Sequence, residues 1–374
     1  MTDFPREEFE ARAAAAQAAM AAAGLDALWL SSEAEVRYFT GFRTLFWQSP
    51  TRAWRLILPR EGAPIAIIPE IGAALMAQTW VEDIRTWPAP RGGDEGVSLT
   101  VDALQGYSTI GIMAGQETAL REPLSDFQAI QSGARIDVVD AWPLVRALRM
   151  TKSEAEISVI REICAAASRA FSRAPNIFAE GMPQDAAFRA FKIALLEEGA
   201  EDVPYLVGGA GQGGYADVIS PPGGALLQKG DVFMLDTGAS LKGYFCDFDR
   251  NWAIGEASDE AKTAHATLWA ATEAGLTAAR PGATAADVCA AMASMTGGGS
   301  DVGRMGHGLG MQLTEQPSLA AFDNTVLRPN MVLTLEPSMM IGGGKMMVHE
   351  ENILITDGAP ELLTERAPAD LPVI

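Results

Sequence analysis

The residues of this chain that are best suited to chemistry are four carboxylates and one histidine in its C-terminal half. Asp236 directly follows the apolar run VFML, and Asp247 comes eleven residues later in the segment YFCDFDRNW. His307 stands between glycines in RMGHGLGMQ, which lets the backbone approach closely and exposes the imidazole. Glu336 ends the run MVLTLE, and Glu350 lies inside KMMVHEENILIT.

Each of these residues has a simple structural explanation when it is considered alone. A single Asp after a strand is typical of a turn or an N-cap, a single His in a glycine loop usually forms a hydrogen bond, and a Glu before Pro is usually solvated. Apolar strands do not readily tolerate uncompensated carboxylates, however. Four carboxylates and one imidazole are therefore better explained together, as ligands of two divalent metal ions. This oxygen-rich set suits manganese, cobalt, zinc or iron.

The elements that must position these ligands are strands that alternate with helices along the whole chain. Residues 55–69 are expected to form a β-hairpin within an α/β domain that covers residues 1–148. A long helix is expected to follow, with Thr151 and Glu154 as its capping box. Beyond it, two helices followed by paired strands occur twice, which predicts an internally duplicated α+β domain.

The first ligand pair is expected on one hairpin of the duplicated domain. Asp236 closes the apolar strand, and a hairpin of this length places Asp247 beside it across antiparallel strands. Strand alternation puts Asp249 on the same face as Asp247, where it could support the ligands from behind. The alternative for Asp249 is a surface ion pair with Arg250.

The composition excludes several classes of function. The chain has 374 residues and a formal net charge of -20, which argues against binding to a nucleic-acid backbone or to an anionic membrane surface. Its three cysteines lack the spacing of a disulfide framework or a zinc cluster. The acidic N-terminal segment has no apolar core of a signal peptide, so a cytoplasmic location is expected.

Taken together, the motifs are identified as those of the creatinase/prolidase family of pita-bread enzymes, which includes the Xaa-Pro aminopeptidases. The chain resembles this family over nearly its whole length, in EVRYFTGF, RMTKSEAEI, LDTGASLKGYFCDFDR, GHGLG, LEP and HEENILIT. The resemblance implies an N-terminal creatinase-like α/β domain over residues 1–148 and a C-terminal duplicated α+β pita-bread domain over residues 149–374. It also implies a homodimer.

The resemblance further implies the role of each ligand. Asp236, Asp247, His307, Glu336 and Glu350 would hold two metal ions, with Asp247 and Glu350 bridging them and Asp236 chelating one. The implied reaction is hydrolysis of a small amide or an Xaa-Pro peptide bond. A metal-bridging hydroxide would attack the carbonyl carbon while Glu336 takes and returns a proton.

Two histidines that peptidases of this family usually carry are missing. The segment GGAGQGGYADVISPPGG has none, and Thr314 stands seven residues after His307, where a histidine is usual. The remaining histidines are His265, expected on a helix surface, and His349, expected to point away from the site. Thr314 and Tyr215 are therefore the candidate catalytic donors in their place.

An aromatic segment of the N-terminal half, FRTLFWQSPTRAW, bears on the substrate. In relatives, residues of this domain reach into the active site of the partner subunit, so Trp47, Arg52 and Trp54 are candidate substrate-binding residues. The two tryptophans could stack on a cationic onium group or a proline ring. Packing in the core is the alternative for Trp54.

Three functions follow from these patterns. The first is an Xaa-Pro aminopeptidase-like or prolidase-like hydrolase with a small-molecule or short-peptide substrate. The second is a metalloenzyme of the same fold that acts on a non-peptide metabolite, such as a dimethylsulfoniopropionate lyase, an ectoine hydrolase or a creatinase-like C–N hydrolase, and the missing histidines favour it. The third is a non-catalytic binding protein, which would have no need of five intact ligands.

Overall fold

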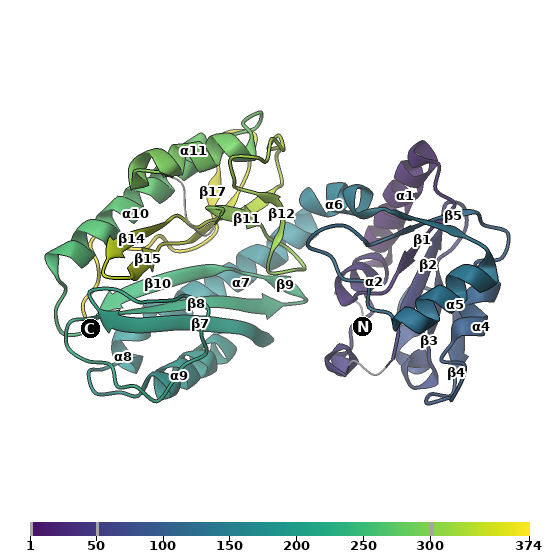
Figure 1. Cartoon of the computed structure of the whole chain (residues 1–374), viewed down its shortest axis with the longest axis horizontal. Helices are drawn as coiled ribbons and strands as arrows, with labels where there is room; N and C mark the ends of the chain where they lie inside the picture. Colours follow the sequence, from purple (N-terminus) through teal and green to yellow (C-terminus); the bar gives the residue numbers. More distant parts are fainter. Residues whose placement is uncertain (1–2, 50–51, 299–302) are drawn as a thin grey trace. The chain divides into compact units, whose positions relative to one another are not determined.

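The protein has two compact units, Met1–Arg149 and Met150–Ile374, in the computed structural model (Figure 1). The structure describes residues 3–49, 52–298 and 303–374. Both units mix helices and strands, which confirms the α/β class predicted from the sequence. Within the described residues, no helix combines the length and the apolar character needed to cross a membrane.

The first unit is built on one six-stranded sheet of order β4-β3-β2-β1-β5-β6. The predicted hairpin is present as the antiparallel pair β2 and β3, whereas β1 and β5, β5 and β6, and β3 and β4 run parallel. Its elements are α1 (Arg6–Ala23), β1 (Ala27–Leu30), α2 (Glu33–Thr40), η1 (Leu45–Gln48), β2 (Arg55–Pro59), β3 (Ile65–Pro69), η2 (Glu70–Gly72), α3 (Ala73–Met76), β4 (Asp83–Trp87), α4 (Val97–Ala103), β5 (Thr109–Ile112), α5 (Leu124–Ala134), β6 (Asp137–Asp140) and α6 (Trp142–Met150).

The second unit repeats one arrangement, in which a pair of helices is followed by antiparallel strands. The first half contains α7 (Glu154–Ser172), α8 (Ala174–Ile177), α9 (Gln184–Glu197), β7 (Asp202–Gln212), β8 (Asp231–Leu241), β9 (Tyr244–Phe245) and β10 (Phe248–Ala253). The second half contains α10 (Asp259–Ala278), α11 (Ala285–Thr296), β11 (Gly306–Gly308), β12 (Glu315–Ser318), β13 (Val332–Leu335), β14 (Ser338–Gly342), β15 (Lys345–Val348), β16 (Glu351–Leu354) and β17 (Glu361–Leu362).

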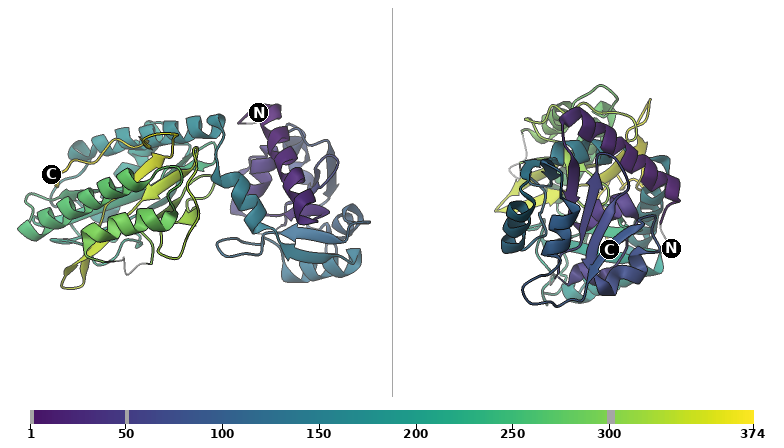
Figure 2. Two further views of the ribbon diagram at one scale, coloured as in Figure 1. Left: turned by 90° about the horizontal axis from the view of Figure 1, so that it is seen from above. Right: turned by 90° about the vertical axis from the view of Figure 1, so that its right-hand side faces the viewer.

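The strands of the second unit lie between two helical layers (Figure 1). Strands β10-β8-β7 form one sheet and β12-β11-β13-β16-β17 another, and β14 pairs with β15. Helices α7 and α9 pack on the first sheet, while α10 and α11 lie side by side against the second half (Figure 2). Because both sheets are covered, side chains on either face of β8 and β13 are buried.

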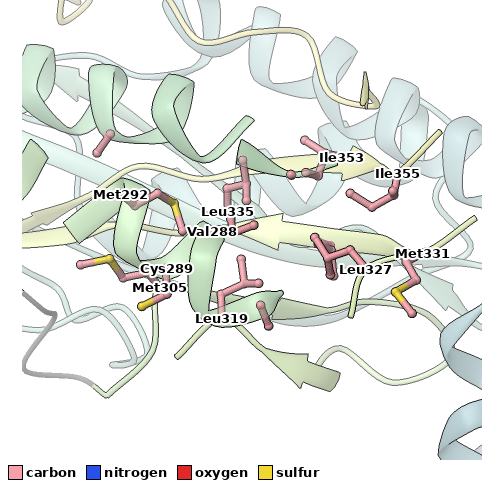
Figure 3. Close-up of a cluster of buried hydrophobic side chains, with 14 residues drawn as sticks. Val288, Cys289, Met292, Met305, Leu319, Leu327, Met331, Leu335, Ile353 and Ile355 are labelled. Atoms are coloured by element: carbon pink, nitrogen blue, oxygen red, sulfur yellow. The ribbon is translucent and has the colours of Figure 1, made fainter. Parts of the chain in front are cut away.

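The second half has its own hydrophobic core beneath the ligand-bearing strands (Figure 3). Val288 and Met292 of α11 pack in this cluster with Leu335 of β13 and Ile353 of β16. Leu335 immediately precedes Glu336, and Ile353 follows Glu350 by three residues. The core therefore lies under the strand that leads to Glu336 and under the strand that follows Glu350.

The capping box of α7 differs from the prediction. Ser153, not Thr151, is the N-cap: its hydroxyl accepts the Glu156 N–H at 3.2 Å, and the Glu156 carboxylate accepts the Ser153 N–H at 2.9 Å. The sequence contains the same spacing twice, two residues apart. Tertiary contact selects the second pair, because the Glu156 carboxylate also accepts the buried Tyr244 hydroxyl at 2.9 Å.

Candidate metal centre

Asp236 lies in the middle of β8 rather than at its end. The strand continues to Leu241, and every residue of it is buried. Asp236 pairs with Val207 of β7 on one side and with Asp249 of β10 on the other. The sequence predicted a strand end here because a buried carboxylate is unfavourable inside a sheet. Inside the strand, the Asp236 carboxylate accepts a hydrogen bond from the Tyr205 side chain of β7.

Asp247 occupies the short break between β9 and β10 and does not stand directly opposite Asp236. One carboxylate oxygen from each of Asp236, Asp247 and Glu350 nevertheless lies within 4.8 Å of the other two. All three side chains are buried. The two halves of the unit therefore bring three carboxylates to one point.

His307 belongs to β11 and points its outer nitrogen at this cluster. Its Nε2 lies 3.3 Å from Asp247 Oδ2 and 3.6 Å from Glu336 Oε2. Its Nδ1 lies 2.9 Å from the Gly308 carbonyl oxygen. A carbonyl can only accept, so Nδ1 carries the hydrogen of this bond and Nε2 is the nitrogen available to a metal.

The two glutamates sit at the ends of neighbouring strands. Glu336 directly follows β13, and its N–H donates to the Met305 carbonyl oxygen at 2.9 Å. Glu350 directly precedes β16, which pairs with β13. The Glu336 side chain is 19% exposed while those of Asp247 and His307 are each 5% exposed, so Glu336 is the ligand candidate that borders solvent.

Burial dominates the electrostatics of these carboxylates. It raises the pKa of Asp236 to about 7, with help from the Glu336 charge and against a hydrogen bond from Tyr205. Burial also raises the pKa of Glu336 to about 7, which nearby Arg304 opposes. The pKa values of Asp247 and Glu350 are raised for the same reason and by the neighbouring carboxylates. Without a cation, so many buried acids cannot all be ionised.

The arrangement fits divalent metal ions. Within the described residues, Asp236 Oδ1 and Glu350 Oε2 are buried oxygens without a hydrogen-bond partner. Buried polar atoms without partners are unfavourable, and these two belong to the three-carboxylate cluster. Four carboxylates and one imidazole Nε2 are a donor set that such ions accept. The residues that could hold them are the five that the sequence predicted: Asp236, Asp247, His307, Glu336 and Glu350.

Asp249 is buried and does not form the surface ion pair that was its alternative. Its Oδ2 accepts the Asn251 Nδ2–H at 2.5 Å, and Arg250 instead pairs with Glu351 at 2.9 Å. Asp249 pairs with Asp236 across the strands, and burial and the Asp236 charge raise the pKa of Asp249 while Arg250 opposes this rise. That Asp249 supports the ligands from behind stays a prediction, and its place beside Asp236 favours this prediction.

Two residues beside the ligands were missed in the sequence. Tyr205 lies on β7, and burial together with the charges of Asp236 and Asp247 raises its pKa. Arg304 lowers the pKa values of Glu336 and Asp247 and is the positive group nearest in chain to His307. Neither could be recognised from residue type, because Tyr205 is placed by strand register and Arg304 by its position before β11.

The two candidate donors are placed differently. Thr314 is half-buried just before β12, outside regular structure. Tyr215 is fully buried: its hydroxyl donates to Asn251 Oδ1 at 3.1 Å and accepts the Val348 N–H at 2.7 Å. Both capacities of the Tyr215 hydroxyl are thus used within the fold, so it has no proton free for a substrate.

The other two histidines are core residues. His265 is buried, against the expected helix surface, because its Nε2 bonds the Pro368 carbonyl oxygen at 2.9 Å. His349 is buried with its Nδ1 2.9 Å from the Thr272 hydroxyl. Both line a cavity of about 230 Å³ together with Trp252, and none of the five ligand candidates lines it. Neither histidine replaces those missing from the sequence.

The aromatic segment is largely packed within its own unit. Trp54 is buried against Phe42 and Trp47, with ring centroids 5.4 and 6.0 Å away, which is the core packing kept as its alternative. Trp47 is buried too, and the Arg121 guanidinium lies 4.9 Å from its ring centroid. Arg52 is half-buried, and residues 50–51 lie outside the described residues. The exposed apolar side chains of this segment are Leu45, at 84%, and Phe46, at 36%.

Comparison with known sequences gives two family matches that together cover most of the chain. Residues 158–357 match metallopeptidase family M24, and residues 12–151 match the creatinase/prolidase N-terminal domain. A probable dipeptidase PepE of Mycobacterium tuberculosis is 29% identical over 367 residues, covering 95% of this chain and 94% of that protein. An Xaa-Pro dipeptidase of Pyrococcus horikoshii is 28% identical over 273 residues, covering 70% and 75%.

Solved structures agree with these matches. The crystal structure of dipeptidase PepE from Mycobacterium ulcerans superposes with a TM-score of 0.85 at 27% identity and covers 99% of both chains. A prolidase from Thermococcus sibiricus superposes with a TM-score of 0.88 over 98% of this chain and 99% of that one, and its 23% identity shows the shared fold alone.

Proposed function

The chain belongs to metallopeptidase family M24, and from this premise we propose that it is a dinuclear-metal hydrolase that cleaves an Xaa-Pro dipeptide or a similarly small amide. Membership makes it a metal-dependent hydrolase and confirms the predicted relationship to the creatinase/prolidase family. The observation that carries the proposal is the convergence of Asp236, Asp247, His307, Glu336 and Glu350 from both halves of the second unit.

The five side chains would hold two divalent ions, for which manganese, cobalt, zinc and iron are the candidates. Such ions supply Lewis acidity and make a coordinated water acidic enough to act as a nucleophile near neutral pH. The protein supplies position and proton transfer. Glu336 is the ligand candidate that borders solvent, so its carboxylate is the one best placed to accept a proton and to return it.

The dipeptidases among the relatives support a short peptide as the substrate. The proposal extends to a cytoplasmic homodimer, as the family resemblance implies. Exposed Leu45 and Phe46, beside the buried Trp47, support a subunit contact at this segment. Trp47, Arg52 and Trp54 would then shape the substrate site indirectly, by holding that segment in place.

One observation favours a second candidate, a metalloenzyme for a small non-peptide metabolite. Thr314 replaces the usual histidine, and both His265 and His349 are bound within the core. A substrate whose carbonyl needs no imidazole donor would fit this site better than a peptide. Dimethylsulfoniopropionate, ectoine and creatine are the substrates to test against Xaa-Pro dipeptides.

The first test is metal content, measured by mass spectrometry on the wild type, Asp247→Ala and Asp357→Ala. Asp357 is an exposed aspartate of the same unit and serves as the matched control. We expect about two ions per chain in the wild type and the control, and their loss in Asp247→Ala, as for a two-metal site. A wild type that takes up no manganese or zinc would contradict the proposal.

A further inference from the structure

The main chain at Asp247 leaves the β-ladder. Strand β9 ends at Phe245 and β10 begins at Phe248, and Asp247 is buried between them. Its N–H and its carbonyl oxygen therefore find no partner in the sheet, although buried backbone groups need one. Both partners come from a single side chain. Asn352 Oδ1 accepts the Asp247 N–H at 2.9 Å, and Asn352 Nδ2 donates to the Asp247 carbonyl oxygen at 2.5 Å.

The residue type matches this two-point contact. A carboxamide carries one acceptor and one donor side by side, so it can replace a neighbouring strand, whereas a carboxylate or an alkyl group cannot. Asn352 is fully buried, and its orientation is fixed from a third direction, because Cys164 Sγ of α7 lies 3.4 Å from Oδ1. The amide therefore has one arrangement in which all three contacts are made.

The contact joins the two halves of the second unit at the ligands. Asn352 lies in β16, two residues after Glu350, and holds the main chain of Asp247 in the other half. A return contact exists, because Arg250 Nη1 donates to the Glu350 carbonyl oxygen at 2.9 Å. Asn352, which follows Glu350, thus holds the main chain of Asp247. Arg250, which follows Asp247, holds the main chain of Glu350.

We infer that Asn352 is a positioning residue of the metal centre, which sets Asp247 against Glu350 at the spacing that the ions require. This inference rests on the proposed function, since it assigns a role toward the same ions. Small displacements of a ligand weaken metal binding, and residues that orient ligands through hydrogen bonds typically change metal affinity about 10- to 100-fold when they are replaced.

The test is titration of manganese into metal-stripped protein, at a temperature where every variant is folded. Asn352→Leu removes both contacts, and we expect manganese binding about 10- to 100-fold weaker. Asn352→Asp keeps the acceptor and loses the donor while adding a negative charge. The added charge alone would tighten binding, so weaker binding in Asn352→Asp identifies the lost contact as the cause. This second variant also keeps the test valid if Asn352→Leu does not fold.

Ile353→Ala is the matched control. Ile353 is the next residue of β16 and points into the hydrophobic cluster, so its truncation destabilises the same strand without touching Asp247 (Figure 3). We expect its manganese affinity to equal that of the wild type. The visible spectrum of the cobalt-loaded protein, which reports ligand geometry, should change in Asn352→Asp and not in Ile353→Ala.

The outcomes separate the two proposals. If the wild type binds no manganese, the proposed function itself fails. If the wild type and the Asn352 variants bind manganese equally well, the positioning role is overturned while the hydrolase proposal stands. The same holds if Ile353→Ala weakens manganese binding as much as the Asn352 variants do, because the loss would then come from a destabilised strand.

Discussion

Burial disfavours the charged form of a titratable side chain unless a partner compensates for it, and this effect shifts pKa values in both halves of the second unit. At the ligands it raises the pKa of acids, and at His265 it lowers the pKa of a base. The first effect is relieved when cations bind. The second remains when cations bind, because His265 is not one of the ligand candidates, and the hydrogen bond to the Pro368 carbonyl oxygen only partly offsets the effect of burial on its pKa.

His265 gives a prediction for stability against pH. Its pKa in the folded protein is lowered, so below its ordinary value of about 6.5 the unfolded chain binds a proton that the folded protein does not. The contribution of neutral His265 to the free energy of unfolding is therefore fully present above about pH 6.5 and is lost as the pH falls toward the lowered pKa. Each unit of lowering is worth about 1.4 kcal/mol.

The measurement is the melting temperature of the metal-stripped protein between neutral and mildly acidic pH. His265→Gln keeps an N–H that can reach the Pro368 carbonyl oxygen and cannot titrate. We expect a shallower fall in melting temperature for this variant than for the wild type. Parallel curves would show that His265 takes no part in the pH dependence.

The ligands could be predicted from the sequence because their types and their motifs are local. The residues around them could not, because each depends on a contact between distant segments. Asn352 reaches Asp247 across more than a hundred residues, and Tyr205 is placed by the register of β7 on β8. His265 was wrongly placed on a helix surface because the carbonyl that binds it lies far along the chain, at Pro368.

At the scale of elements, local signals predicted which strands and helices exist better than where they end. The hairpin of β2 and β3 lies within residues 55–69 as predicted, and helices precede the strands in both halves of the second unit as predicted. The end of β8 was predicted five residues too early, at Asp236. A buried carboxylate is unusual inside an apolar strand, and Asp236 is a ligand candidate. A prediction from strand composition therefore ends β8 at this residue, although the strand continues.

The start of α7 offers a prediction at this scale. Ser153→Ala removes the N-cap hydroxyl and should cost about 1 kcal/mol of stability. For a unit of this size that corresponds to a fall in melting temperature of roughly 2–4 °C. Thr151→Ala is the matched control, because Thr151 is exposed and makes no cap, and it should change stability by less than about 0.5 kcal/mol. A larger loss from Thr151→Ala would restore the capping box first predicted.

At the scale of the whole molecule, the ligands belong to one unit only. All five lie in Met150–Ile374, and none lies in Met1–Arg149. A ligand that binds only the folded state stabilises it by about 2.7 kcal/mol at a hundredfold excess over its dissociation constant. This gain should be confined to the unit that contains the site.

Hydrogen–deuterium exchange with and without manganese tests this expectation segment by segment. We expect slower exchange in β8, β11, β13 and β16, and unchanged exchange in β1, β2 and β5. In Asp247→Ala the metal should slow exchange in neither unit. Equal protection of the first unit would mean that metal binding is transmitted beyond the second.

The division of the ligands between two halves also has a consequence during synthesis. Asp236 and Asp247 leave the ribosome about a hundred residues before Glu350. At a synthesis rate of roughly 5–20 residues per second, that delay is on the order of 5–20 seconds. For this time the first half carries acids that have neither their metal nor the Asn352 amide. The complete set of five ligand candidates is therefore available to a metal only once Glu350 has been translated.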